Sequence, residues 1–251
     1  RLLSRGLGDV YKRQFIGSHV IKKLLQNKEN VVFNLDKMGY ASSTYMLDKL
    51  IKENSSISSN QYKFLNIDLS SKPETEKAIE EARPNLIMHL AAESHVDRSI
   101  DGPEEFIKSN IVGTFNLLES ARNFWSRLNS DEKDNFRFHH ISTDEVFGSL
   151  GDSGSFSEET PYDPRSPYSA SKASSDHLVK AWFHTYRMPI LLTNCSNNYG
   201  PWQFPEKLIP LVIFKAFQNE KIPIYGDGLN IRDWLFICLL YTSPSPRDRS
   251  L

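Results

Sequence analysis

Two pairs of polar residues could perform proton-transfer chemistry if the fold brings them together. Tyr168 and Lys172 are four residues apart, and Asp144 and Glu145 are adjacent. A phenol titrates near pH ~10, so a tyrosine that acts as a base near neutrality needs a neighbouring cation, which Lys172 could supply. Taken alone, this spacing also fits an ordinary half-buried tyrosine and a solvated lysine. The elements that carry the two pairs decide between these interpretations.

The acid pair follows a predicted strand. Residues 136–142, with the sequence Phe-Arg-Phe-His-His-Ile-Ser, are typical of a buried strand. Thr143, Asp144 and Glu145 come next, where the chain becomes polar. These side chains are therefore expected at a strand end, although an acid pair in such a place is also compatible with a solvated turn.

The Tyr/Lys pair lies on a predicted helix that covers residues 168–186. Ser166 fits its N-cap and Pro167 its first position, because a serine side chain caps free backbone N–H groups and proline needs none. Residues four apart share one face of a helix, so Tyr168 and Lys172 are expected side by side.

Composition excludes several classes of protein. The chain has 251 residues and a formal net charge of -1, which fits one large globular domain, or one and a half, and gives no basic excess for a nucleic-acid partner. Its longest apolar runs are too short to span a membrane, and the N-terminus lacks a signal peptide, so a cytoplasmic location is expected. With two cysteines, Cys195 and Cys238, the sequence indicates neither a disulfide framework nor a metal site.

The fold class is predicted to be α/β, with a Rossmann-like, doubly wound parallel sheet. Short apolar runs alternate with helical patterns, and such alternation favours parallel strands whose ligands lie beyond their carboxyl ends. The predicted strands cover residues 31–35, 62–67, 85–90, 136–142 and 189–194, and the clearest helices cover residues 104–125 and 168–186.

A dinucleotide site is indicated at the first of these strands. Asp36 ends the 31–35 run about 20 residues after Gly17, where a carboxylate binds the ribose hydroxyls of NAD and repels the extra phosphate of NADP. Only Gly17 matches the glycine motif of such sites, because Gly6 and Gly8 lie too far upstream. The alternative, that Asp36 merely ends a strand, therefore stays open.

Several segments of the chain resemble motifs of a known protein family, and this resemblance extends beyond the dinucleotide site. Its most specific segments are Leu-Ala-Ala-Glu-Ser-His-Val-Asp-Arg-Ser at 90–99, Ser-Thr-Asp-Glu-Val at 142–146, Tyr-Ser-Ala-Ser-Lys at 168–172, Asn-Asn-Tyr-Gly-Pro at 197–201, and residues 225–234. With these segments in this order, residues 15–237 resemble the nucleotide-sugar 4,6-dehydratases. This is a family of extended short-chain dehydrogenases/reductases, and the chain is most similar to the members that act on dTDP-glucose.

The resemblance implies an NAD-dependent dehydration of dTDP-glucose to its 4-keto-6-deoxy product. Tyr168, assisted by Lys172 and Thr143, would take the O4 proton while NAD takes a hydride from C4. Glu145 would then remove the C5 proton, Asp144 would protonate the leaving C6 hydroxyl, and the hydride would return to C6. Related sugar 4-epimerases carry small hydroxyl residues in place of the acid pair.

The same resemblance implies the binding residues and the assembly. Contacts with NAD are expected from Phe15, Ile16, Gly17, Asp36, Lys37, Asp68, Leu69, Leu90, Ala91, Ala92, Ser109, Tyr168, Lys172 and Asn198. Contacts with the nucleotide sugar are expected from Ser94, Thr143, Asn197, Lys207, Leu208, Pro223, Ile224, Tyr225 and Arg232. The helices at 104–125 and 168–186 resemble the pair through which family members form homodimers.

The two ends of the chain do not fit the family. Residues 1–14 contain no strand-like run and residues 238–251 read as a solvated tail, so both are interpreted as foreign sequence joined to a fragment. The NAD-binding domain is then expected at residues 15–194 with its first strand and Gly-rich loop replaced, and a truncated sugar-binding domain is expected to begin at 195–237. A noncatalytic or unstable fragment, or an enzyme for another nucleotide sugar, are the alternatives.

Overall fold

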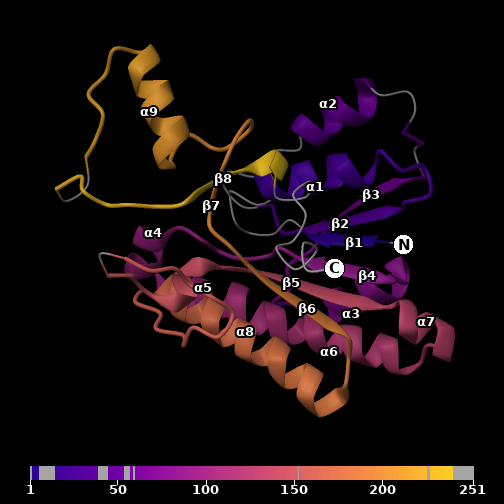
Figure 1. Cartoon of the computed structure of the whole chain (residues 1–251). Helices are drawn as coiled ribbons and strands as arrows, with labels where there is room; N and C mark the ends of the chain where they lie inside the picture. Colours follow the sequence, from indigo (N-terminus) through magenta and orange to yellow (C-terminus); the bar gives the residue numbers. More distant parts are fainter. Residues whose placement is uncertain are drawn as a thin grey trace, which may run out of the picture.

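A six-stranded parallel sheet forms the centre of the molecule, with helices on both faces (Figure 1). The structure is a computed structural model and describes residues 2–5, 15–38, 45–53, 57–58, 60–151, 153–224 and 227–239. The strands are β1 Leu2–Arg5, β2 Val32–Asp36, β3 Tyr62–Asn66, β4 Leu86–His89, β5 Arg137–Thr143 and β6 Ile190–Cys195. Their order, β3-β2-β1-β4-β5-β6, confirms the predicted doubly wound sheet.

Helices cover the two faces of this sheet unequally. Helices α1 (Gly17–Leu24) and α2 (Tyr45–Glu53) lie above the sheet in Figure 1. Below it lie α3 (Lys72–Ala82), α6 (Gly113–Ser126) and α8 (Pro167–Tyr186). Shorter helices, α4 (Val96–Asp101), α5 (Pro103–Phe106) and α7 (Ser130–Asn135), connect these elements.

The expectation that residues 1–14 contain no strand is wrong for Leu2–Arg5. These residues form β1 and pair in parallel with both β2 and β4, with Leu2 opposite Val32 on one side and Leu86 on the other. Two parallel neighbours offer ladder hydrogen bonds on both sides, so backbone pairing can hold a short strand whose sequence gives no strand pattern. The expected absence of a Gly-rich loop falls on residues 6–14, which lie outside the described residues.

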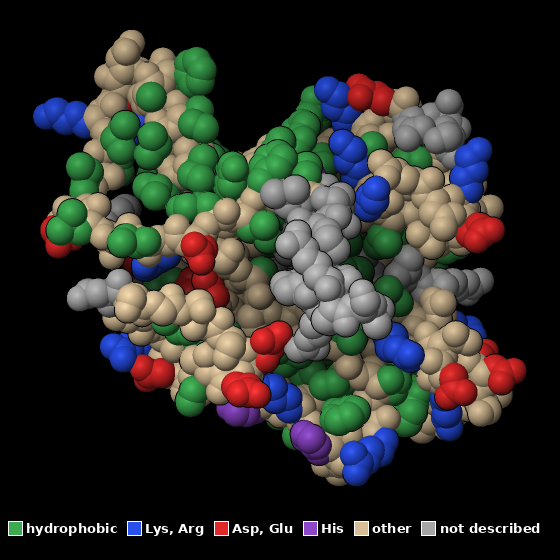
Figure 2. All heavy atoms as spheres, viewed as in Figure 1, with side chains coloured by type: hydrophobic (Ala, Val, Ile, Leu, Met, Phe, Trp, Pro, Cys, Tyr) green, Lys and Arg blue, Asp and Glu red, His purple; other side chains and the backbone are tan. Residues whose placement is uncertain are grey.

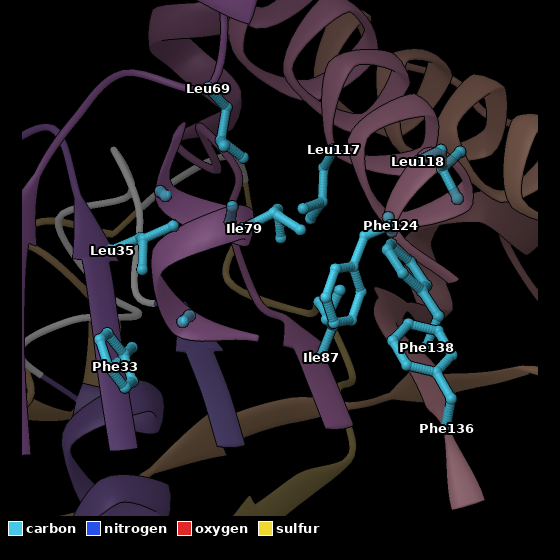
Figure 3. Packing of buried hydrophobic residues seen from close by; sticks show 14 of the residues in the cluster. Phe33, Leu35, Leu69, Ile79, Ile87, Leu117, Leu118, Phe124, Phe136 and Phe138 are labelled. Carbon is cyan, nitrogen blue, oxygen red and sulfur yellow. The ribbon is translucent and has the colours of Figure 1, made fainter. Parts of the chain in front are cut away.

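The main core lies between the sheet and the helices below it. Figure 3 shows Phe138 of β5, and Phe136 just before this strand, beside Phe124 of α6, with Ile87 and Ile79 nearby. These side chains are almost fully buried, and they belong to one continuous cluster. The apolar alternation that predicted β5 thus reflects direct packing of the strand on α6.

The predicted single helix at 104–125 is interrupted. A π-helical turn, Ile107–Val112, separates α5 from α6 and buries Ser109 and Asn110. At the next residue, Gly113, an added Cβ would lie 3.0 Å from the Leu69 Cβ, so glycine lets the backbone approach the β3–α3 connection without displacing Leu69. Wide turns of this kind occur often at functional sites.

A smaller unit follows β6. Strands β7 (Asn197–Tyr199) and β8 (Trp234–Phe236) pair in parallel, and α9 (Leu208–Phe217) stands away from the sheet in Figure 1. No residue of α9 is buried, although the helix is apolar around most of its circumference. Figure 2 shows the resulting cluster of hydrophobic side chains (green) at the upper left.

We predict that Phe138→Ala lowers the free energy of unfolding by about 3–5 kcal/mol, because it removes a buried ring and leaves a cavity in the core. Phe217→Ala is the matched control, since Phe217 is 86% exposed, and it should change stability by less than about 0.5 kcal/mol. Urea denaturation of both variants measures the difference. Equal losses would contradict the packing described for β5 and α6.

Candidate active site

The acid pair lies where β5 ends, as the sequence predicts. Thr143 caps a short 3₁₀ helix, Asp144–Phe147, and its hydroxyl oxygen accepts a hydrogen bond from the Glu145 backbone N–H at 3.2 Å. The same hydroxyl donates to Asp144 Oδ1, also at 3.2 Å. Both acids line one cavity of about 1760 Å³, so the pair faces a cleft and does not form a fully solvated turn.

A glycine ends this acidic turn. Gly148 has φ of 85°, and an added Cβ would lie only 2.6 Å from the Asp163 carbonyl oxygen. The Asp163 backbone N–H donates to the Val146 carbonyl at 3.0 Å. Glycine is required for this close return of the chain, which holds the acids at the edge of the sheet.

The environment of Asp144 favours its protonated form. Burial raises the pKa of this carboxyl, and the opposing effects of the Thr143 hydrogen bond and of the positive charge of Arg232 are smaller. A carboxyl that stays protonated to higher pH is suited to donate a proton.

Helix α8 carries the Tyr/Lys pair, and its start is as predicted. Ser166 forms a capping box with Ser169, and Pro167 occupies the first turn. Tyr168 is 4% exposed, and its ring meets that of Phe106 edge to face. Ser166 and Ser169 line the same cavity as the acids, so the start of α8 borders the cleft.

Lys172 of the Tyr/Lys pair contacts β5, the strand that leads into the acid pair. Its side chain is 1% exposed, and Nζ donates to the carbonyl of Ile141 at 3.1 Å. Ile141 lies on β5, the strand whose end carries Thr143 and the acids. The interpretation of Lys172 as a solvated lysine is therefore wrong, and one strand end holds both halves of the predicted chemistry.

A buried carboxylate beneath this lysine was missed at the sequence level. Asp176, one helical turn after Lys172, accepts hydrogen bonds from His140 Nε2 at 3.0 Å, Ser142 Oγ at 2.7 Å and Tyr162 Oη at 3.0 Å. An acid four residues after Lys172, on the same helix face, was the available signal.

The carboxyl end of β2 carries the predicted ribose-binding acid. Asp36 is fully buried, and its Oδ1 accepts a hydrogen bond from the Met38 backbone N–H at 2.8 Å. Next to it, Lys37 Nζ donates to Ser109 Oγ at 3.1 Å and lies 3.3 Å from Glu93 Oε1. Two strand ends and a helical turn therefore meet at one edge of the sheet: Lys37 follows β2, Glu93 lies in the segment after β4, and Ser109 belongs to the π-helical turn.

The other predicted cofactor residues lie along the same edge of the sheet. Phe15 and Ile16 are buried immediately before Gly17, the first residue of α1. Asp68 and Leu69 follow β3, and Leu90, Ala91 and Ala92 follow β4. Leu69 points into the main core, so only its backbone could face a ligand. In β7, the Oδ1 atom of Asn198 is buried without a hydrogen-bond partner among the described residues.

The structure brings only some of the predicted sugar-binding residues together. Asn197 and Arg232 line the cavity beside the acid pair. The described lining of that cavity does not include Ser94, Lys207, Leu208, Pro223 or Ile224, and Ile224 is 75% exposed. Tyr225 lies outside the described residues. Arg232 is placed to meet an anion, since it is the positive charge that acts on Asp144.

His89 and His95 are hydrogen-bonded within the protein. His89 Nε2 lies 2.8 Å from Thr114 Oγ1, and His95 caps α4. In the part of the chain that the structure describes, no group of three or more histidine, cysteine, aspartate or glutamate side chains is arranged to hold a metal ion. No described helix is both long and apolar enough to cross a membrane.

The strand order, together with a Tyr-x-x-x-Lys helix at the end of β5, defines the short-chain dehydrogenase/reductase class of Rossmann-like proteins. A family model described as GDP-mannose 4,6 dehydratase matches residues 14–238. The chain belongs to this family of nucleotide-sugar 4,6-dehydratases, as the sequence motifs predicted.

Several proteins with high similarity to this chain are dTDP-glucose 4,6-dehydratases. The chain is 52% identical over 224 residues to the dTDP-glucose 4,6-dehydratase of Neisseria meningitidis, covering 89% of this chain and 61% of the relative. A crystal structure of the Bacillus anthracis dTDP-glucose 4,6-dehydratase in complex with NAD has 37% identity and a TM-score of 0.79, covering 94% of this chain and 67% of that one. The Streptomyces venezuelae dTDP-glucose 4,6-dehydratase with NAD bound has 37% identity and a TM-score of 0.81, with coverages of 95% and 68%. The chain therefore spans 61% of the length of the Neisseria relative.

We predict that Asp144→Asn stabilises the protein near neutral pH. A carboxyl whose folded-state pKa is raised binds its proton more tightly when folded, so its ionisation costs stability once the pH rises above the ordinary value near ~3.9. The gain in Tm should be present at pH 7 and should shrink as the pH falls toward the ordinary aspartate pKa.

Thermal melts across this pH range measure the effect. Asp134→Asn, at an exposed aspartate of α7, is the control and should show no such pH-dependent gain. A destabilised Asp144→Asn protein at pH 7 would contradict the assignment of a raised pKa to this carboxyl.

Proposed function

We propose that this chain carries the active site of an NAD-dependent dTDP-glucose 4,6-dehydratase, a lyase that forms dTDP-4-keto-6-deoxyglucose. One observation carries the proposal: Lys172 of the Tyr/Lys pair bonds to Ile141 of β5, that strand is followed by two acids that line the cleft, and burial raises the pKa of Asp144. The sugar and the base are supported by the names of the relatives, which are dTDP-glucose 4,6-dehydratases.

The residues at the strand ends fit an NAD molecule. Asp36 offers a carboxylate where the adenosine ribose lies in this fold, and α1 begins at Gly17, where a pyrophosphate would meet backbone N–H groups. Bound NAD would supply a hydride acceptor for C4 of the sugar and return the hydride to C6.

The side chains would divide the proton transfers among them. Tyr168, as a phenolate stabilised by the Lys172 ammonium, would take the O4 proton when C4 is oxidised. The resulting ketone acidifies the C5 hydrogen, which Glu145 would remove. Asp144 would give its proton to the departing C6 hydroxyl, so that water leaves.

The raised pKa of Asp144 supports this division of roles. Two adjacent carboxyls can act as acid and base at one pH only if their environments keep them in different protonation states. Burial raises the pKa of Asp144, which favours the acid role for this carboxyl. A sugar 4-epimerase, the alternative enzyme, needs no second acid, and the acid pair at the cleft therefore favours dehydration.

The domain boundaries follow from this proposal. The NAD-binding domain would consist of residues 15–194 together with β1 (Leu2–Arg5), which lies in the middle of its sheet and corrects the expected start at residue 15. Residues 195–237 would begin the domain that holds the nucleotide sugar. The exposed apolar surface of α9 supports the second assignment, because a helix that is apolar around most of its circumference is normally covered. The cytoplasmic location stays a prediction.

The proposal is tested by incubating the purified chain with dTDP-glucose and NAD and following the 4-keto product by its absorbance in alkali. We expect Glu145→Gln to lower kcat by about 10²–10⁴-fold, because it removes the base for the C5 proton. Glu159→Gln, at an exposed glutamate in the loop before α8, is the matched control and should leave the rate unchanged.

Thermal melting with and without NAD separates the remaining outcomes. Saturating NAD at about 100 times its Kd should stabilise a folded binding protein by about 2.7 kcal/mol. Stabilisation by NAD without any product would reject catalysis by this chain and favour a noncatalytic binding module. Absence of a cooperative melt would favour the unstable fragment.

We infer that α6 and α8 form a homodimer contact. Aromatic side chains gather on these neighbouring helices: Phe115 is 40% exposed and meets Trp182 edge to face, and Tyr186 is 42% exposed. Clusters of exposed aromatic side chains are typical of protein interfaces.

We predict that Phe115→Glu gives a monomer, because a carboxylate at the centre of this contact would lose its water without gaining a partner. Sedimentation velocity of the wild type and the variant measures the change. Phe217→Glu on α9 is the control and should leave the dimer intact. Dissociation by Phe217→Glu alone would place the contact on α9.

A further inference from the structure

The carboxylate of Asp176 is the centre of a buried polar network beneath the proposed active site. Its side chain has no exposed surface, and it receives hydrogen bonds from His140 and Ser142 of β5 and from Tyr162 of the loop before α8. No step of the proposed reaction uses Asp176. A fully buried acid that meets three donors is a costly feature, which calls for a role.

The network reaches Lys172 through His140. Lys172 Nζ lies 3.5 Å from His140 Nε2, the same nitrogen that bonds to Asp176 Oδ1. A carboxylate only accepts hydrogen bonds, so this nitrogen carries a hydrogen and cannot also accept one from the ammonium. The close approach of Lys172 therefore reflects the attraction of its charge to the Asp176 carboxylate behind the imidazole.

Charge balance explains the arrangement. Burial disfavours an ammonium, and at 1% exposure Lys172 would lose its proton readily unless a negative charge compensates it. The backbone carbonyl of Ile141 supplies a partial charge only. Tyr168, Lys172 and Asp176 are spaced by four residues on α8, so the carboxylate lies on the opposite side of the ammonium from the phenol along the helix.

Asp176 is itself kept ionised. Burial raises the pKa of this carboxyl, but the hydrogen bond and charge of His140, the charge of Lys172 and the Ser142 hydrogen bond outweigh it and lower the pKa overall. Burial and the negative charge of Asp176 raise the pKa of Tyr162, which therefore stays protonated and donates. The other titratable groups around the network are His89, which stacks against His140, and Lys180 and His177, which contact Tyr162.

We propose that Asp176 is a positioning residue of the active site: its carboxylate, which lies behind the His140 imidazole, holds Lys172 as an ammonium beside Tyr168. The inference rests on the proposed function for its consequence in catalysis, but the Asp176–Lys172 coupling can be measured without turnover. Asp176 touches neither cofactor nor substrate and acts through Lys172.

The direct test is a pH titration of Lys172 in the full chain, monitored by ¹³C NMR of lysines labelled at Cε. The Lys172 resonance is identified by its loss in Lys172→Arg. In Asp176→Asn, which keeps the shape and removes the charge, we expect the pKa of Lys172 to fall by at least about one unit. Tyr162→Phe is the matched control, because it removes one hydrogen bond to the same carboxylate and keeps its charge. An unchanged Lys172 pKa in a folded Asp176→Asn protein would overturn the inference.

A second measurement covers the case in which Asp176→Asn does not fold. Coupling between two sites is reciprocal, so Lys172→Met should raise the pKa of Asp176 by the same amount, measured by ¹³Cγ NMR. No change in the Asp176 titration would overturn the inference. A merely structural role for Asp176 predicts lower Tm values for these variants without either shift.

The pH dependence of turnover separates a failure of this inference from a failure of the proposed function. The phenolate and ammonium coexist only below the Lys172 pKa, so the alkaline limb of the kcat profile in Asp176→Asn should move to lower pH by the shift seen in the NMR titration. If the titration shifts but neither protein makes the 4-keto product, the coupling holds and the proposed function fails. If the product forms and the alkaline limb and the titration stay in place, the inference fails and the proposed function holds.

Discussion

The hydrogen bond from the buried Lys172 ammonium to the Ile141 carbonyl is the interaction on which the site depends. It fixes the first half of α8 against the end of β5, and so sets the distance between a helix residue, Tyr168, and a strand-end residue, Thr143. A buried cation tolerates little displacement, because any movement away from its acceptors exposes an unpaired charge to an apolar environment. The position of the helix is therefore set by electrostatics as well as by packing.

Most strands of the sheet were predictable from the sequence. The runs that became β2 to β6 are rich in apolar residues and are followed by polar ones, and this pattern can be recognised without knowing which elements pack beside each strand. The first strand, Leu2–Arg5, was not predictable, because it is short and carries mixed residues. Its position between β2 and β4 comes from backbone pairing, which leaves no trace in side-chain pattern.

Some residues of the candidate site were likewise predictable from the sequence, and others were not. Tyr168, Lys172 and the acids could be found because their spacing along the chain already has chemical meaning. The spacing of Asp176 from Lys172 was visible in the sequence, but its hydrogen-bond donors were not, because they are 14 to 36 residues away and meet the carboxylate only in the folded chain. Exposure of Ile224, which was expected to contact the sugar, likewise depends on which elements cover the segment after α9.

Burial acts with opposite consequences on the two acids at 144 and 176. At Asp144 the hydrogen bonds of Thr143 and of two backbone N–H groups, with the charge of Arg232, do not offset the loss of water, so the pKa rises. At Asp176 the hydrogen bond and charge of His140, the charge of Lys172 and the Ser142 hydrogen bond outweigh the same loss, so the pKa falls. Both carboxyls receive hydrogen bonds, so the charged neighbours decide the direction of the shift. His140 and Lys172 meet Asp176 because α8 packs on β5, whereas the charge of Arg232 acts on Asp144 less strongly than burial does.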